Sequence, residues 1–322
     1  RDLHSFPTRR SSDLARPLAD RRHAPQVHPL RHKCGMPGRI VLPDPIRLNI
    51  LMAWPSEDFP KRTGGADRSM VPKRLWHVRS KWRRHLGLTG SKTVRRHIPA
   101  TSLLSRQTLS RYLRRYREIY VKPVYGSYGN RIVKVTRSGG GYLLHHEQRV
   151  RRIGGNSVQG AILRHAKKGK FMVQQGVRMI RPGGRPCDFR VLLLRPGDRW
   201  LLMGIMGKQA TGNRVVTNFR HGGRPVRLNT ALRGAGWNEE QIRRTKRQMT
   251  DLAMAAAAQF TRRYPHCRRL GIDIAVDTSR RLWILEVNTN PEYELFRHHE
   301  SPGIYSRIHR LTRAIRSRQS NR

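Results

Sequence analysis

Residues 270–291 constrain the fold of this chain more than any other stretch. Two apolar runs, 270–276 and 282–287, flank a short polar segment, which is the pattern of a β-hairpin. Each predicted strand carries one acid within its apolar run, Asp273 in the first and Glu286 in the second. An unpaired carboxylate is costly to bury, so two acids inside apolar strands require an explanation.

The acids of the predicted hairpin have a third oxygen donor beside them. Asn288 follows Glu286 by two residues, so both side chains point to the same face of the strand. Together with Asp273 they bring three oxygen donors to one end of the hairpin, with few basic residues expected beside them. Hard oxygen donors in small number, with room for substrate phosphates, suit Mg²⁺ better than zinc or calcium. The sequence therefore predicts a magnesium site, and the alternative is a hairpin with two incidental acids.

The strongly basic composition limits the partners of the chain. Its 322 residues include 67 Lys and Arg against 20 Asp and Glu, a formal net charge of +47. Such a charge attracts polyanions, for example nucleic acid, anionic lipid headgroups or acidic polymers. The basic residues are spread along the chain and no stretch interleaves them with aromatic residues. We therefore expect no specific nucleic-acid partner, and a basic polyanion-binding or nucleic-acid-binding protein remains an alternative that rests on charge alone.

Cysteine usage and hydropathy indicate the cellular compartment in which the protein is expected. The three cysteines, Cys34, Cys187 and Cys267, are odd in number and far apart, with no C-x-x-C pair. This pattern favours a reduced, cytoplasmic setting over a disulfide framework. No run approaches the roughly 18 apolar residues of a membrane span. The N-terminal region also lacks the continuous apolar segment of a signal peptide.

The first 75 residues do not have the pattern of a folded domain. Residues 1–14, RDLHSFPTRRSSDL, resemble the translation of a sequencing adapter. The stretch that follows, up to Asp67, holds many Pro, Arg and His residues. We predict that residues 1–75 are disordered or not native to the protein, and that residues 76–322 form the folded domain.

Periodicity and turn residues predict alternating strands and helices in the second part of the chain. Strands are expected over residues 118–124, 132–136, 170–177, 187–194 and 200–207. Helices are expected over residues 105–116, 157–166 and 304–315. A longer helix begins after Asn238, which is placed to cap it, and ends at Tyr264-Pro265.

A lysine at the end of a predicted strand leads into a glycine-containing loop, KPVYGSYG, at residues 122–129. Backbone N–H groups of such a loop can approach phosphate oxygens, and Lys122 adds a point charge. A Gly-x-x-Gly turn alone is most often a simple hairpin turn, and the Walker pattern G-x-x-x-x-G-K-[ST] is absent. Further along, Asp188 and Arg190 share one face of a predicted strand, where a buried Asp–Arg pair that holds the sheet together is the alternative to a role in a site.

In this order the motifs resemble the ATP-grasp superfamily, and within it the YheC/YheD endospore coat-associated family. The resemblance covers about residues 80–315. It rests on SKWRRHLGL, IPAT, YVKPVYGSYG, FMVQQGV, CDFRVLLL, VVTNFRHGG, and GIDIA with WILEVNTNP. It implies an α+β chain with the ATP-grasp fold, in which two α+β subdomains clasp ATP between antiparallel sheets within residues 76–322.

The resemblance also implies roles for individual residues, carried over motif by motif. The residues expected to bind the nucleotide are Lys81, Lys122 near the α-phosphate, Gly126, Ser127 and Gly129 of a mobile lid, Gln175 and Gly176 of the adenine hinge, Asp188 near the ribose, and Asn218. The residues expected to act in catalysis are Lys122 and Arg190, with Arg190 neutralising the transferred phosphate. The residues expected to hold Mg²⁺ are Asp273, Glu286 and Asn288. Gln175 departs from the glutamate of many ATP-grasp hinges, and Arg131 stands where the lid often has another glycine.

The resemblance implies an ATP-dependent ligase. Such an enzyme passes the γ-phosphate of Mg-ATP to a substrate carboxylate, and an amine or thiol then attacks the acyl phosphate. The basic composition fits an acidic acceptor such as a peptide or polymer with carboxylates. The family name adds an association with the endospore coat and its components to the cytoplasmic setting. Two alternatives stay open, a catalytically silent nucleotide-binding coat protein and the basic polyanion-binding protein.

Overall fold

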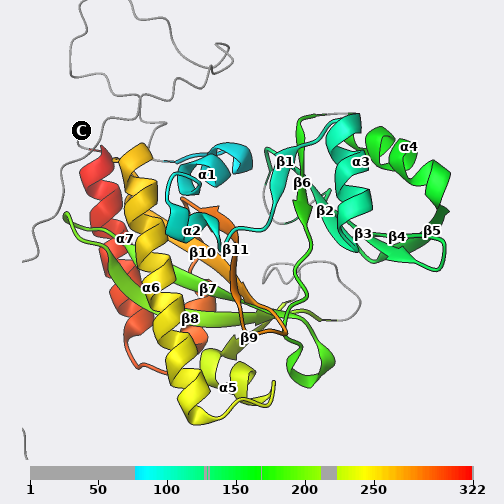
Figure 1. Ribbon diagram of the computed structural model, residues 1–322. Helices are drawn as coiled ribbons and strands as arrows, with labels where there is room; N and C mark the ends of the chain where they lie inside the picture. Colours follow the sequence, from blue (N-terminus) through cyan, green and yellow to red (C-terminus); the bar gives the residue numbers. More distant parts are fainter. Residues whose placement is uncertain (1–76, 127–128, 130, 168, 212–222, 321–322) are drawn as a thin grey trace, which may run out of the picture. The chain divides into compact units, whose positions relative to one another are not determined.

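The computed structural model describes residues 77–126, 129, 131–167, 169–211 and 223–320 (Figure 1). All of these residues fall within the unit Gly65–Arg322. The predicted N-terminal segment 1–75 and the candidate site residues Ser127 and Asn218 lie outside the described residues.

The helices and strands of the described part alternate along the chain. The strands are β1 (Thr101–Leu103), β2 (Glu118–Pro123), β3 (Val133–Ser138), β4 (Gly141–His146), β5 (Arg149–Gly154), β6 (Phe171–Gln175), β7 (Cys187–Leu194), β8 (Leu201–Gln209), β9 (Arg224–Arg227), β10 (Arg269–Val276) and β11 (Leu282–Asn288). The helices are α1 (Lys81–Leu88), α2 (Lys92–Arg95), α3 (Arg106–Arg115), α4 (Gly155–Ala166), α5 (Leu228–Arg233), α6 (Glu239–Arg263) and α7 (Ile304–Ser320), with 3₁₀ turns η3 (Pro182–Gly184) and η5 (Glu294–His298).

The first sheet has six strands in the order β1-β6-β2-β3-β4-β5, all paired antiparallel. Strand β2 alternates strictly between buried and half-buried residues. Its buried residues Ile119 and Val121 pack with Val133, Val135 and apolar residues of α3 and α4. These two helices cover one face of the sheet (Figure 1). Alternation in a strand sends successive side chains to opposite faces, so Tyr120 and Lys122 point away from these helices.

The second sheet has five strands in the order β11-β10-β7-β8-β9, also antiparallel. Strand β7 is buried over nearly its whole length, and its two sides pack against different elements. Phe189 and Val191 lie in a core with residues of α6, whereas Leu192 and Leu194 lie in a separate core with residues of α7 and η5. One strand therefore serves two cores, one on each face of the sheet.

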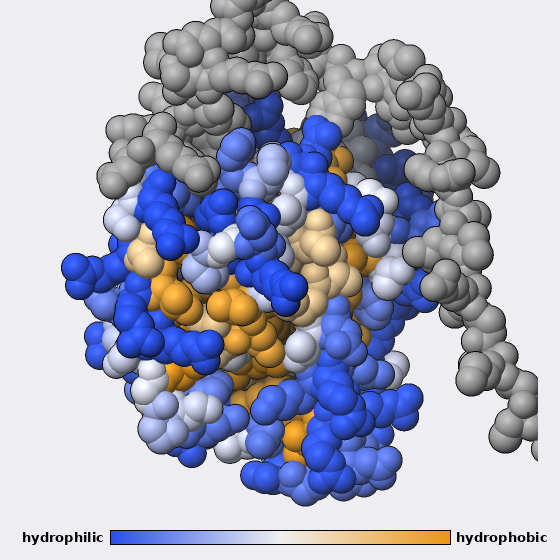
Figure 2. Space-filling view, turned by 90° about the vertical axis from the view of Figure 1, so that its left-hand side faces the viewer, coloured by the Kyte–Doolittle hydropathy of each residue, from blue (hydrophilic) through white to orange (hydrophobic). Residues whose placement is uncertain are grey.

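Helix α6 forms as its sequence predicts. The side chain of Asn238 accepts from the backbone N–H of Gln241, and the Gln241 side chain accepts from the Asn238 N–H, a capping box. Glu239 and Glu240 occupy the first turn, where the helix dipole favours negative charge. No described helix is both long and apolar enough to span a membrane. Figure 2 shows one face of the molecule, where hydrophilic side chains surround an apolar area near its centre.

The expected α+β arrangement with antiparallel sheets is confirmed. The hairpin that opened the sequence analysis is the pair β10 and β11, and the other predicted strands and helices form close to their predicted bounds. The β4–β5 hairpin was not predicted. Strand β5, with the sequence RVRRIG, is an exposed edge strand, so it shows no apolar alternation for a periodicity argument to detect.

Candidate active site

Most of the candidate residues line one cavity of about 390 Å³. Those lining it are Lys81, Lys122, Gly126, Gly129, Gln175, Asp188, Arg190, Asp273, Glu286 and Asn288. Gly176 is not among the lining residues. The structure thus brings together side chains from α1, from the first sheet and from the second sheet.

The register of the β10–β11 hairpin sets the positions of the three predicted metal ligands. Asp273 is the cross-strand partner of Glu286, and Gly271 is the partner of Asn288. The Asn288 amide Nδ2 lies 3.5 Å from Asp273 Oδ2. A Cβ atom at Gly271 would lie 2.7 Å from the Cβ of Pro291, so a glycine is needed for the chain after β11 to pack over the hairpin. The three side chains predicted as metal ligands therefore lie at one end of the hairpin, and their role in holding a metal stays a prediction.

The expectation that few basic residues lie beside these acids is wrong. Asp273 accepts from Arg190 Nε at 2.6 Å and from Arg190 Nη2 at 3.1 Å. Lys208 Nζ lies 3.0 Å from Asp273 Oδ1 and 2.9 Å from Asp188 Oδ2. The reason is the register, which places Arg190 opposite Asp273 and Lys208 opposite Asp188 on neighbouring strands.

Ion pairing keeps Asp273 charged although it is buried. Burial by itself raises the pKa of this carboxyl, but Arg190 and Lys208 outweigh burial and lower the pKa to about 2. Burial by itself lowers the pKa of Lys208, and Asp188 and Asp273 outweigh it and raise that pKa. Each partner thus stabilises the ionised form of the other.

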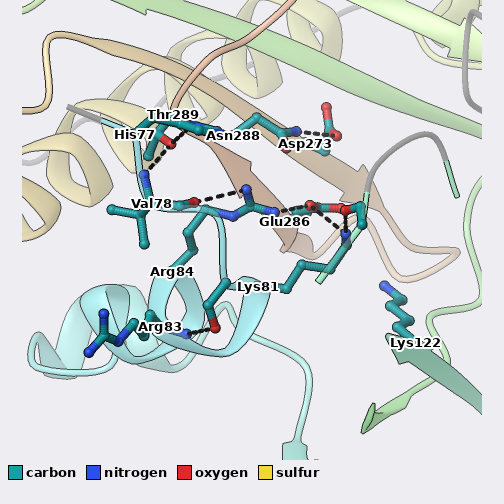
Figure 3. A network of polar contacts seen from close by, with 12 residues as sticks. His77, Val78, Lys81, Arg83, Arg84, Lys122, Asp273, Glu286, Asn288 and Thr289 are labelled. Atoms are coloured by element: carbon teal, nitrogen blue, oxygen red, sulfur yellow. Dashed lines mark hydrogen bonds and ion pairs between the residues drawn. The ribbon is translucent and has the colours of Figure 1, made fainter. Parts of the chain in front are cut away.

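Glu286 is held by bases from α1 (Figure 3). Its Oε1 accepts from Arg84 Nη2 at 2.6 Å and lies 3.9 Å from Lys81 Nζ. Burial raises the pKa of Glu286, but Arg84, Lys81 and Lys122 outweigh burial and lower it. Arg84 also donates to the Val78 carbonyl, and its buried Nε has no hydrogen-bond partner among the described residues. Both hairpin acids are therefore carboxylates at neutral pH.

The two candidate nucleotide lysines approach the cavity from different elements. Lys81 donates to the carbonyl of Gly126, the first residue of the predicted lid that the structure describes. Lys122 donates to Gln174 Oε1 at 2.6 Å, and Gln174 in turn donates to Thr101 Oγ1 at 3.1 Å. Burial lowers the pKa of both lysines, and Glu286 opposes this shift in each case. Both amines lie where an anionic ligand would restore the charge that burial disfavours.

The predicted hinge makes its hydrogen bonds within the protein. Gln175 Oε1 accepts from the backbone N–H of Ala100 at 3.3 Å, and the N–H of Gly176 donates to the Glu118 carbonyl at 2.8 Å. A Cβ atom at Gly176 would lie 2.6 Å from Glu118 Cγ, so close strand packing explains this glycine. The role of Gln175 and Gly176 as an adenine hinge stays a prediction from the resemblance.

The cavity-lining residues that sequence reasoning missed include Arg84, Lys208 and His77. Arg84 follows Lys81 by three residues on α1, a spacing that places both on the same helix face. Lys208 stands at the end of an apolar strand, as Lys122 does, and this signal was available. His77 Nδ1 lies 2.9 Å from Thr289 Oγ1, a contact across 212 residues that no local pattern reveals.

The donor set fits Mg²⁺ held together with a phosphate ligand. Among the described residues no group of three or more His, Cys, Asp or Glu is placed to hold a metal ion. The hairpin instead offers two carboxylates and one amide oxygen, and Mg²⁺ characteristically binds one or two carboxylates plus substrate phosphates. Cations from α1, β7 and β8 surround the acids, which suits a polyanion better than a bare cation.

The profile of the family described as YheC/D like ATP-grasp matches residues 76–313. The chain belongs to this family, and the resemblance noted in its motifs is confirmed. It is 25% identical over 231 residues to the endospore coat-associated protein YheD of Bacillus subtilis (strain 168), a match that covers 68% of this chain and 49% of YheD. The chain therefore spans about half the length of this curated relative.

Solved structures with a similar arrangement include two synthetases. The D-cycloserine synthetase DcsG has a TM-score of 0.47 at 14% identity, over 76% of this chain and 71% of the other. The D-alanyl-alanine synthetase A of Vibrio cholerae O1 has a TM-score of 0.46 at 12% identity, over 74% of this chain and 65% of the other. Membership of the family rests on the profile match over residues 76–313.

Proposed function

We propose that the protein binds Mg-ATP in the 390 Å³ cavity and acts as an ATP-dependent ligase that joins a carboxylate to an amine or thiol. One observation carries this proposal. In a chain of the ATP-grasp family, the buried Lys81, the half-buried Lys122, an arginine and the oxygen donors of a hairpin line the same cavity. A cavity of this size lies within the range typical of small-molecule sites.

The residues of the cavity have distinct roles in the proposed reaction. Lys81 and Lys122 bind the phosphate chain of ATP, and Arg190 neutralises charge on the γ-phosphate while it passes to the carboxylate oxygen. Asp188 orients the ribose, and Gln175 borders the adenine, with Gly176 next to it in the hinge but outside the cavity lining. The acyl phosphate then loses phosphate when the amine or thiol attacks its carbonyl carbon.

Asp273, Glu286 and Asn288 are the residues proposed to hold Mg²⁺, which supplies charge neutralisation and alignment of the phosphates when bound. Arg190 and Lys208 keep Asp273 ionised, and Arg84 and Lys81 keep Glu286 ionised. The chain thus presents its two carboxylates in the deprotonated state that metal binding requires.

The first experiment is calorimetry of ATP binding to the full chain with and without Mg²⁺. We expect binding that needs Mg²⁺ and weakens at least about tenfold in both Lys122→Ala and Glu286→Ala, because each removes a charged group from the phosphate region. Lys134→Ala is the matched control, since Lys134 pairs with Glu118 on the next strand and does not line the cavity. Equal loss in all three variants, or no ATP binding, would contradict the proposed site.

The ligase reaction is tested with hydroxylamine as the attacking amine. An acyl phosphate reacts with hydroxylamine to give a hydroxamate and free phosphate, so a carboxylate substrate yields hydroxamate together with ADP. Acidic peptides are the first acceptors to screen, because the net charge of +47 favours anionic substrates. ATP binding without hydroxamate or ADP from any acceptor would favour the catalytically silent alternative.

We propose that this protein is associated with the endospore coat. This proposal is supported by the name of the Bacillus subtilis relative, which is called endospore coat-associated. The expectation of a cytoplasmic protein rests on the cysteine usage of the chain. Fractionation of sporulating cells that express the chain, with antibody detection in the cytosolic and coat fractions, separates the two settings.

A further inference from the structure

A groove of about 720 Å³ runs along the C-terminal helix α7, away from the candidate active site. The residues of α7 that line it, among them Tyr305, His309 and Arg313, recur at helical spacing on one stripe. A different stripe of α7, with Ile308 and Ile315, is buried in the core beneath the second sheet. The stripe that lines the groove is therefore not needed to hold the helix in place.

The lining of the groove carries charge of one sign. Among the described residues that line it are Arg297, Arg310 and Arg313 and no acid, while Glu294 pairs with Arg297 beside the lining. Within the described part of the chain Arg310 and Arg313 are exposed and form no hydrogen bond or ion pair, so both guanidinium groups face solvent. This arrangement complements a partner that carries several carboxylates.

The wall of the groove is held in place by its own contacts. Glu294 accepts from Arg297 Nε at 2.6 Å and from the Tyr305 hydroxyl at 2.7 Å. Arg297 lies over the Tyr305 ring, 4.0 Å from its centroid, and Tyr293 packs against the same ring at 5.7 Å. The Tyr293 hydroxyl lies 3.0 Å from His309 Nδ1. A wall fixed in this way loses little side-chain freedom when a partner binds.

The same contacts argue against two other polyanions. Single-stranded nucleic acid is usually bound by aromatic faces on which bases stack, and the Tyr305 face is already covered by Arg297. A lipid surface is usually bound through apolar side chains that insert beside the basic ones. The large apolar residues that are exposed in the described part are Leu103, Tyr125 and Val150, and none of them lines the groove.

The groove is joined to the cavity through a short stretch of backbone. Glu292 lines the cavity, and its carbonyl accepts from Arg190 Nη1 at 3.4 Å. The 3₁₀ turn η5 begins two residues later, and its Arg297 lines the groove. The cavity residue Arg190 and the core residue Leu192 beneath α7 also lie on one face of β7, since they are two residues apart on a strand.

We infer that this α7 groove docks an acidic segment of the peptide that the ligase modifies, so that one carboxylate of the same peptide reaches the cavity. The modification of the docked peptide rests on the proposed ligase function, whereas the docking itself does not require catalysis. The bound segment carries aspartate or glutamate side chains that pair with Arg310 and Arg313. Binding in the groove raises the effective concentration of the reacting carboxylate at the cavity.

The test is the binding of a labelled oligoglutamate peptide to the full chain at near-physiological salt, followed by fluorescence anisotropy. In the double variant Arg310→Gln/Arg313→Gln we expect affinity to fall about tenfold, the size expected from losing two exposed ion pairs. Arg244→Gln/Arg247→Gln is the matched control, since these exposed arginines of α6 have the same spacing and the same charge change. Its affinity is expected to stay within about twofold of the unchanged protein.

Three outcomes decide the inference. An equal loss in the two double variants would overturn it, because attraction would then come from net charge alone. The inference would also be overturned if the α7 double variant lost affinity for a single-stranded oligonucleotide probe but kept its affinity for oligoglutamate. That result would assign the groove to nucleic acid. Preference for oligoglutamate over oligoglutamine of the same length, lost only in the α7 variant, supports it.

Kinetics separate this inference from the proposed function. With an acidic peptide acceptor, the α7 variant is expected to raise KM for the peptide about tenfold and to leave kcat and the KM for ATP unchanged. Ligase activity with an unchanged peptide KM would overturn the groove and leave the ligase standing. Groove-dependent peptide binding with no ADP release from any acceptor would support the groove and count against the ligase.

Discussion

Strand β7 divides one face of the second sheet into two halves that are stabilised in opposite ways. Toward its start, Asp188 and Arg190 enter a buried network of ion pairs at the cavity. Toward its end, Leu192 and Leu194 pack against α7 in an apolar core. Residues two apart on one strand thus lie in a charged environment and in an apolar one. We call the part with Asp188 and Arg190 the cavity half and the part with Leu192 and Leu194 the α7 half.

The two halves contribute differently to the stability of the fold and to ligand binding. Packing in the α7 half stabilises the fold directly, since removal of apolar surface from water is favourable. The cavity half holds its charges at a desolvation cost that the ion pairs largely offset, so such networks add little net stability. A cost of this kind, kept next to a cavity, is typical of a site that binds a charged ligand.

The largest effect is expected in the cavity half from Asp273→Ala. This change removes the carboxylate that the half-buried Arg190 and the buried Lys208 share, which should lower the free energy of unfolding by about 4 kcal/mol. Urea denaturation followed by circular dichroism measures it. Asp251→Ala, at an exposed position of α6, is the control and should change stability by less than about 0.5 kcal/mol.

A somewhat smaller effect is expected in the α7 half from Leu192→Ala. Leu192 is fully buried, so truncation removes apolar contacts and leaves a cavity, at about 3 kcal/mol. Unlike Asp273→Ala, it should leave the affinity for Mg-ATP unchanged at a temperature where the variant is folded. A variant that loses ATP binding while remaining folded would show that the halves are not independent.

Acid should weaken the cavity half through Asp273. The pKa of Asp273 lies at about 2 in the folded protein against an ordinary 3.8, so the unfolded chain binds more protons between these values. The stability that this group provides is complete above pH 4 and is lost as the pH falls through the folded pKa, by about 2 kcal/mol. Unfolding curves of the unchanged protein and Asp273→Asn between pH 5 and pH 2 should therefore converge. Parallel curves would contradict the ion-pair account.

The smallest net change is expected when two charges are removed together. Lys208→Met alone removes an ion pair of the buried Asp188 carboxylate and should cost about 3 kcal/mol. Adding Asp188→Asn removes that charge, so the double variant should lie within about 1 kcal/mol of the unchanged protein. A double-mutant cycle by urea denaturation gives the interaction energy. If the losses of stability in the two single variants were additive, the Lys208–Asp188 ion pair would not be the source of the destabilisation.

Local pattern in the sequence was enough to locate much of this molecule. The apolar runs 270–276 and 282–287 predict the hairpin that the structure shows, whereas the magnesium site predicted from the acids within it remains a prediction. Asn238 predicts the start of α6 because capping depends on residues within one turn. Roles for Lys122 and Gln175 came from family resemblance instead, and they remain predictions.

Tertiary structure alone decided which charges meet and which surface stays open. Arg84 and Glu286 are separated by 202 residues, and Lys208 meets Asp273 only because the register of β7 with its two neighbours aligns them. The α7 groove likewise depends on how η5 packs beside the helix. Periodicity tells which face a side chain takes, because it follows from backbone geometry within a few residues. Partners across a sheet depend on pairing between distant segments, which one sequence by itself does not encode as a local signal.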